Sequence, residues 1–172
     1  IGAALIMAVG FGWANPVPVN MRNFRNSKGG MALTALAGPV SNLLAATISL
    51  FFSNLVFFTR DSWAATRTAY AIYMILQYFF IYFAEINIAL AVFNLIPIPP
   101  LDGYNVLSYF TSEKVDRWFY RHQREVTFAF IVIILGLSYI PSAHNPLYIV
   151  TDFVSDTLWK AVSWIPRVKW GW

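Results

Sequence analysis

The amino-acid sequence predicts an all-α, multi-pass membrane helix bundle with a short extended segment near its N-terminus. Of the 172 residues, 58% are hydrophobic and only 12% are charged, whereas a soluble domain carries about 25% charged residues. The mean hydropathy is +0.56. Two segments each supply the roughly 20 mostly apolar residues that a bilayer span requires. We therefore expect one membrane-embedded domain over residues 1–172.

Two long apolar segments are the expected transmembrane helices. Residues 31–58 begin with many Ala, Gly, Ser and Thr side chains, which let helices approach closely within lipid. Residues 69–96 are rich in aromatic side chains and include Gln77 and Glu85. An acid inside a span usually faces the bundle interior and finds a partner there. A structural hydrogen bond is therefore favoured for Glu85 over a place in a proton or water path.

The later part of the chain predicts two further helices. Residues 126–140 form a shorter apolar run that Pro141 stops, and we expect a third transmembrane helix there. Residues 145–165 mix Asp and Lys into an apolar pattern. That mixture predicts a helix that either re-enters the membrane or lies along its surface.

A short stretch near the N-terminus reads "GWANPVPVN", in which prolines alternate with Val17 and Val19. The alternation favours an extended conformation. The two prolines would lack their N–H groups on one edge, so such a strand would pair only through the other edge. A Pro-rich turn is the alternative interpretation of the same residues.

Loop charges predict the orientation in the membrane. Two basic groups lie on the same side of the two long spans, and the loop between the spans carries fewer cations. The positive-inside rule places the more basic side in the cytoplasm, and Asp102 near the cytoplasmic face. We expect a multi-pass protein of a bacterial cytoplasmic membrane, whose partner is the lipid bilayer. The net charge of +4 comes in short clusters, which argues against a nucleic-acid partner. The basic residues are Arg22, Arg25, Lys28, Lys114, Arg117, Arg121 and Arg124 on one side, and Arg60 and Arg67 on the other.

The sequence contains no cysteine, which excludes disulfides, thiolate zinc sites and cysteine nucleophiles. Any metal ion must therefore be held by His, Asp or Glu. His122 and His144 are the two histidines, and neither has a second histidine three or four residues further on. We interpret both as ordinary loop residues.

The segment "FNLIPIPPLDG" ends the second long span and carries an acid, Asp102, just before its final glycine. Its three prolines remove backbone donors and disfavour helix at the residues before them. Unwound backbone at membrane depth is tolerated where it is buried in protein or lines a wet cavity. Asn94 and Asp102 flank this segment, so it predicts an internal polar site. Asp102 either caps the next helix or serves metal or proton chemistry.

Two motifs together resemble the site-2 protease family of intramembrane zinc metalloproteases. "NLIPIPPLDG" is similar to the family signature Asn-x-x-Pro-x-Pro-x-x-Asp-Gly, and "LAGPVSN" is similar to its Gly-x-x-x-Asn motif. "GFGWANPVPVN" followed by "RNFRN" also resembles the segment before that span. The motif residues in this sequence are Gly38, Asn42, Asn94, Pro97, Asp102 and Gly103.

The resemblance implies roles for these residues and one zinc ion. Asp102 would be a zinc ligand, beside two histidines and a general base from a His-Glu-x-x-His helix. Asn94 would steady the substrate carbonyl or the developing oxyanion, and Asn42 would orient the core. No His-Glu-x-x-His occurs in the 172 residues. We therefore expect the sequence to be a C-terminal part of a longer protein.

The implied function is zinc-dependent hydrolysis of peptide bonds in or near transmembrane segments of membrane-anchored substrates. A substrate helix must unwind first, and Val17 and Val19 are candidates for a strand that clamps the unwound segment. One alternative is a catalytically inactive relative that binds transmembrane segments as a chaperone or scaffold. Another is a small transporter that moves protons through Glu85 and Asp102. The oligomeric state is left open.

Overall fold

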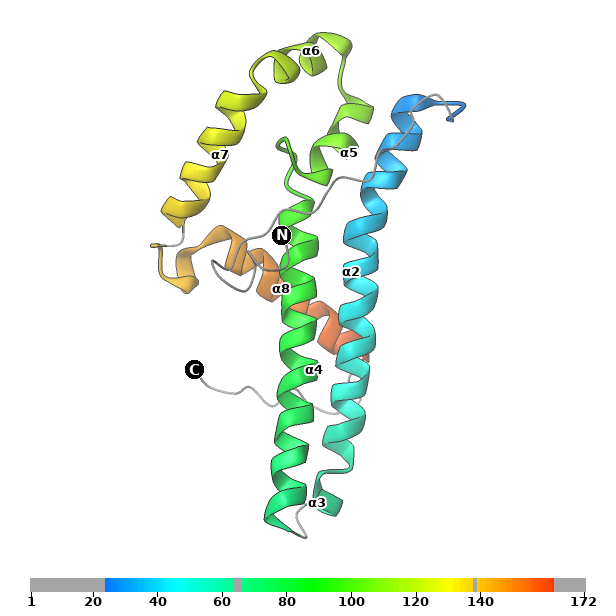
Figure 1. The fold of residues 1–172 in the computed structure, drawn as a ribbon, viewed down its shortest axis with the longest axis vertical. Coiled ribbons are helices and arrows are strands. Elements are labelled where there is room, and N and C mark those ends of the chain that lie inside the picture. Colours follow the sequence, from blue (N-terminus) through cyan, green and yellow to red (C-terminus); the bar gives the residue numbers. More distant parts are fainter. Residues whose placement is uncertain (1–23, 64–65, 138, 163–172) are drawn as a thin grey trace, which may run out of the picture.

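The computed structural model of the protein describes residues 24–63, 66–137 and 139–162, and its described residues are mainly helical (Figure 1). No strand occurs within those ranges, and the predicted extended segment with Val17 and Val19 lies outside them. The predicted helical class is confirmed for the described part. The elements are α2 Ser27–Phe58, α3 Arg60–Trp63, α4 Arg67–Asn94, α5 Asp102–Phe110, α6 Glu113–Arg121, α7 Gln123–Leu137, the 3-10 helix η2 Ser142–His144, and α8 Pro146–Val162.

The helices α2 and α4 form a long hairpin. The side chain of Asn26 accepts a hydrogen bond from the Gly29 N–H group and caps α2, and Thr66 does the same for α4. Both helices are long and apolar enough to cross a membrane. α2 has 32 residues, which corresponds to about 48 Å at 1.5 Å per residue. α4 ends at Asn94, two residues before the predicted end, because Pro97 disfavours helix in the residues before it.

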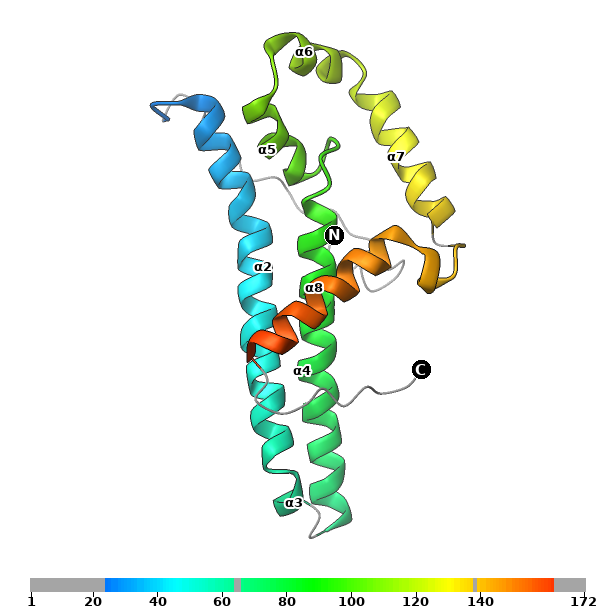
Figure 2. The ribbon, with the colours of Figure 1, turned by 180° about the vertical axis from the view of Figure 1, so that it is seen from behind.

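The middle of the hairpin is packed around small side chains. Ala46, Leu50, Ala84 and Ile88 are completely buried there. α8 crosses the hairpin obliquely at this level (Figure 2). Small alanine side chains let α8 approach closely, as is typical of helix contacts in lipid. The α8 side chains on this core are Val154, Leu158, Trp159 and Val162.

Polar side chains within the hairpin are joined to neighbouring groups. Ser49 donates to the Phe80 carbonyl at 2.8 Å, and the Gln77 amide donates to the Ser53 hydroxyl at 2.9 Å. The predicted structural hydrogen bond of Glu85 is confirmed, because Ser155 of α8 donates to its Oε1 at 2.8 Å. These bonds hold α2, α4 and α8 together.

α7 is apolar but short. It has 15 residues, about 22 Å in length, which is less than the roughly 30 Å hydrocarbon core. Among the described helices, only α2 and α4 are long and apolar enough to cross a membrane, and α7 is not one of them. Its contacts near the candidate site come from Phe130, whose ring packs on Phe93 with centroids 5.7 Å apart.

α5 runs antiparallel to the first turns of α2, which places Asp102 beside Gly38, about a third of the way along α2. At one end, a Cβ atom on Gly29 would lie 3.5 Å from the Tyr109 ring. At the other end, a Cβ atom on Gly38 would lie 3.2 Å from Asp102 Oδ2. The buried Ala32 lies between the two glycines on α2. Small residues at intervals of about one turn thus allow the two helices to pack closely.

Candidate functional site

The Pro-rich segment between α4 and α5 forms a series of tight turns. The Ile98 N–H group donates to the Ile96 carbonyl at 2.8 Å, and the Leu101 N–H group donates to the Ile98 carbonyl at 3.0 Å. Thr127 of α7 donates to the Pro99 carbonyl at 3.3 Å. The prolines have no N–H group to satisfy, so they suit a segment without helical hydrogen bonds. The turns reverse the chain and bring α5 back toward α2.

Gly103 makes this reversal possible. A Cβ atom at this position would lie 2.2 Å from the Leu95 carbonyl oxygen and 2.5 Å from that of Ile96. Both distances are far inside van der Waals contact, so only a glycine fits without moving the backbone. Gly103 is buried, and Pro97 lies at the surface of the same turn. The Gly of the Asp-Gly pair therefore fixes the start of α5 against the end of α4.

Asp102 is the first residue of α5, and its carboxylate has an unusual environment. The N-cap residue is Leu101, and no side-chain hydrogen bond caps the helix. Asp102 therefore does not act as the cap of α5, which was one of the two alternatives for this residue. Within the described residues the carboxylate has no hydrogen-bond or ion-pair partner, although it is half-buried. Burial raises the pKa of the Asp102 carboxyl group above its ordinary value. One of its oxygens, Oδ2, lies in the space that a side chain on Gly38 would occupy, 3.2 Å from the position of a Cβ atom there.

The two asparagines of the motifs share this lack of partners. Asn42 lies one helical turn after Gly38 on the same side of α2, and Asn94 is the last residue of α4. Both side chains are half-buried, and neither has a hydrogen bond to the rest of the described chain. The structure thus places Asp102 next to Gly38, whereas no hydrogen bond joins Asn94 to either of them.

The histidines are used elsewhere. A ring nitrogen of His122 lies 2.9 Å from the Trp118 carbonyl oxygen, and the His122 ring stacks on Trp118 with centroids 4.8 Å apart. His144 is exposed in η2. Over the part of the chain that the structure describes, no group of three His, Cys, Asp or Glu side chains could hold a metal ion. The unpaired carboxylate of Asp102 could supply one ligand to a zinc ion. A complete zinc site needs further ligands from other residues.

A polar network at the beginning of α2 was not predicted from the sequence. The interpretation of the loop charges gave Lys28 a role in topology, but its ammonium group contacts Asp116 at 2.7 Å. An open pocket of about 570 Å³ borders this network, lined among others by Met31, Pro100 and Tyr104. Lys28 and Asp116 are 88 residues apart in the sequence. No local sequence pattern could therefore have predicted that they pair.

Comparisons with known proteins agree with the motifs. Residues 18–138 match Peptidase family M50. Over 107 residues the chain is 41% identical to "Putative zinc metalloprotease YwhC" of Bacillus subtilis (strain 168), a match that covers 62% of this chain and 46% of that relative. The chain thus spans about half the length of the relative, and no solved structure matches it. The resemblance inferred from the two motifs is confirmed: the chain belongs to Peptidase family M50, the family of the site-2 proteases.

Proposed function

We propose that this chain is part of an intramembrane zinc metalloprotease that hydrolyses peptide bonds in or near transmembrane segments, with Asp102 as one zinc ligand. The observation that carries the proposal is the Asp102 carboxylate. It is half-buried, it has no partner among the described residues, and it lies next to Gly38 of the second family motif. Partial burial disfavours a carboxylate that has no partner, and a metal ion would supply the missing interaction.

The chemistry of the site divides between the metal and the chain. A zinc ion bound with three protein ligands leaves a fourth position for water and lowers the pKa of that water to about 7. Asp102 would hold the ion from the start of α5, where Gly103 and Gly38 fix its position. Asn94 would offer its amide N–H groups to the substrate carbonyl at the end of α4. An amide that is already free of other hydrogen bonds needs no rearrangement to do so.

Two further parts of the proposal concern the substrate. The scissile carbonyl of a helical substrate is hydrogen-bonded within its own helix, so the substrate must unwind before hydrolysis. We place Val17 and Val19 in the strand that would receive the unwound segment. Asn42, one turn from Gly38, would orient the core of the site.

The orientation of the site follows from the charges. Lys28 of α2 is bonded to Asp116 of α6, so the two basic groups at the start of α2 and around α6 share one end of the molecule (Figure 1). By the positive-inside rule this end is cytoplasmic. We therefore propose a multi-pass protein of a bacterial cytoplasmic membrane that cuts near the cytoplasmic face.

The test replaces Asp102 with alanine in the full-length protein, purified in detergent. We expect zinc to be lost and cleavage of a membrane-anchored reporter to fall to background. Asp152→Ala is the matched control, because Asp152 is an exposed carboxylate on α8 without a partner in the described structure. Full zinc content and full activity in Asp102→Ala would contradict the ligand assignment. A wild-type protein that binds transmembrane segments without zinc and without cleavage would instead be an inactive chaperone or scaffold.

A further inference from the structure

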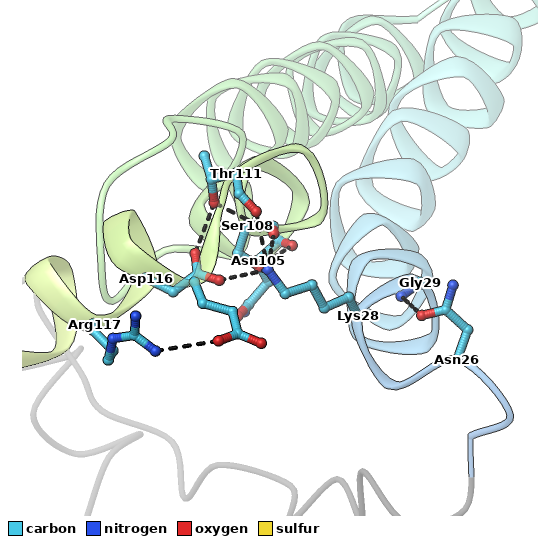
Figure 3. A network of polar contacts seen from close by, with 9 residues as sticks. Asn26, Lys28, Gly29, Asn105, Ser108, Thr111, Asp116 and Arg117 are labelled. Carbon is cyan, nitrogen blue, oxygen red and sulfur yellow. Dashed lines mark hydrogen bonds and ion pairs between the residues drawn. The ribbon is translucent and has the colours of Figure 1, made fainter.

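Lys28 makes an unusually complete set of contacts at the cytoplasmic end of the bundle. Its Nζ donates to Asp116 Oδ2 at 2.7 Å, to the Thr111 carbonyl at 3.0 Å and to the Ser108 carbonyl at 3.2 Å. Figure 3 shows the side chain reaching from α2 to these three acceptors. An ammonium group has three N–H donors, so every donor of Lys28 is used.

The acceptors explain why a cation belongs at this position. The last carbonyl groups of a helix have no partner within the helix, and the partial negative charge at a helix C-terminus favours a cation. Ser108 lies in the last turn of α5, and Thr111 is its C-cap residue. Lys28 therefore caps α5 from a different helix.

Asp116 extends the same network to α6. Its second oxygen, Oδ1, accepts a hydrogen bond from the Thr111 hydroxyl at 2.7 Å. Asp116 lies in the first turn of α6, where the helix dipole favours a negative charge. Lys28 and Asp116 thus join the start of α2, the end of α5 and the start of α6.

The opposite end of α5 carries Asp102. α5 has nine residues, so its ends are about 13 Å apart. Lys28 and Gly38 are separated by about 15 Å along α2 at the same rise per residue. The stretch of α2 from Lys28 to Gly38 therefore matches α5 in length. The two helices are bonded at one end through Lys28 and lie side by side at the other end, where Asp102 is next to Gly38. A short helix fixed at both ends cannot tilt, whereas release of one end lets the other end move.

We infer that Lys28 is a positioning residue for Asp102, which it holds in place by clamping the far end of α5 to α2. The inference rests on the proposed function, because it needs Asp102 as the metal ligand. It assigns a role in the site to a residue that lies outside both family motifs. Two residues of α2 then define the position of α5. Gly38 leaves the space in which the Asp102 carboxylate lies, and Lys28 sets the direction of α5.

The first measurement tests the clamp without any metal. The 172 residues contain no cysteine, so two introduced cysteines are the only thiols in this part of the protein. Spin labels at Leu33 on α2 and Phe110 on α5, which are 73% and 77% exposed, report the distance between the helices in the full-length protein. We expect Lys28→Met to broaden the distance distribution, and Lys28→Arg to restore most of it.

Lys114→Met is the control, because Lys114 is an exposed lysine on α6 without a partner in the described residues. It should leave the distribution unchanged. Asp116→Asn provides a second route if Lys28→Met does not fold, since it removes one charge and keeps a side chain of the same shape. Narrow, wild-type distances in both clamp variants would overturn the inference.

The second measurement connects the clamp to the metal. We expect Lys28→Met to weaken zinc binding about tenfold, within the range seen when groups that orient metal ligands are removed. The visible spectrum of the Co²⁺-substituted protein should change as well, and Lys28→Arg should restore both. Broadened distances with unchanged zinc affinity would show that Lys28 holds α5 without positioning Asp102.

The two proposals fail in different ways. Asp102→Ala with full zinc content would refute the proposed function, and the distance measurement would still report whether Lys28 holds α5. Zinc loss in Asp102→Ala with an unaffected Lys28→Met variant would keep the proposed function and refute this inference.

Discussion

The polar side chains of the α2–α4 hairpin and the first residue of α5 fall into two groups that differ in whether they have hydrogen-bond partners. Those in the middle and at the far end have partners, as the bonds from Ser155 to Glu85 and from Gln77 to Ser53 show. Those of the family motifs, Asn42, Asn94 and Asp102, have none among the described residues. The first group therefore holds helices together, whereas the second is available for a ligand or a substrate.

One atom departs from this division. The Oε1 atom of Gln77 is buried without a partner, although the amide nitrogen of the same side chain donates to Ser53. An unsatisfied buried acceptor costs about 1–3 kcal/mol. The motif side chains differ from it because they are only half-buried and can be reached by another group. A polar side chain without a partner is therefore a candidate site only where a ligand or substrate can reach it.

The largest expected effect is the loss of proteolysis in Asp102→Ala, with no loss of stability when the two proteins are compared without metal. The carboxylate has no described partner to lose, and burial already disfavours its charged form. The thermal unfolding temperature of the metal-free protein in detergent should therefore stay the same or rise, while the activity measured with zinc falls to background. Strong destabilisation of the metal-free Asp102→Ala variant would show that Asp102 holds helices together, like the polar side chains of the first group.

Asn94→Ala should lower the turnover number by about 10²–10³-fold and leave the zinc content unchanged, as expected for the loss of one oxyanion donor. The readouts are steady-state cleavage of a reporter substrate and metal analysis of the same preparation. Asn87→Ala is a suitable control, because the Asn87 amide is already used by the Phe83 carbonyl. Loss of zinc in Asn94→Ala would mean that the asparagine supports the fold of the site.

Gly103→Ala should destabilise the protein by about 1–3 kcal/mol or more, the usual cost of overpacking. The added methyl group would overlap the Leu95 and Ile96 carbonyl oxygens, so the turn must move. Gly136→Ala on α7 is the control, since nothing lies within 4 Å of its added Cβ atom. Equal unfolding temperatures for the two variants would contradict the close approach at Gly103.

Ser155→Ala tests the partnered group and should cost about 0.6 kcal/mol, the average for a hydrogen bond between membrane helices. The hydroxyl of Ser155 is buried against Glu85, and its loss should loosen α8 without affecting the metal site. Thermal unfolding and proteolytic activity measured together check this expectation. A large loss of activity at unchanged stability would move Glu85 into the functional group.

The pH dependence of the clamp is an effect of similar, small size. Hydrogen bonds from Lys28 and Thr111 hold the pKa of Asp116 below its ordinary value of 3.8. The stabilisation is therefore present above that value and is lost as pH falls through the lower folded pKa. The pair is partly exposed, so its contribution is at most about 1 kcal/mol. The unfolding temperature measured as a function of pH should change on the acidic side in Asp116→Asn. It should not change there in the control variant Asp152→Asn.

The sequence was sufficient for features that depend on neighbouring residues. The apolar runs predicted the two long helices within a few residues of their observed bounds, because a bilayer-length run of apolar residues has few alternatives. The prolines predicted the break after α4, and the two motifs predicted the family. Local spacing could not decide between capping and ligand roles for Asp102, since both place an acid at the start of a helix.

Only the tertiary structure decided which distant residues meet. Lys28 and Asp116 are 88 residues apart, and Glu85 and Ser155 are 70 apart, so their pairing depends on how α5, α6 and α8 pack on the hairpin. The contact of Gly38 with Asp102 depends on the same packing. A sequence fixes the period and length of each helix through local interactions. The partner of each polar side chain is set by the close approach of surfaces that are far apart along the chain, and that approach decides which side chains remain free for chemistry.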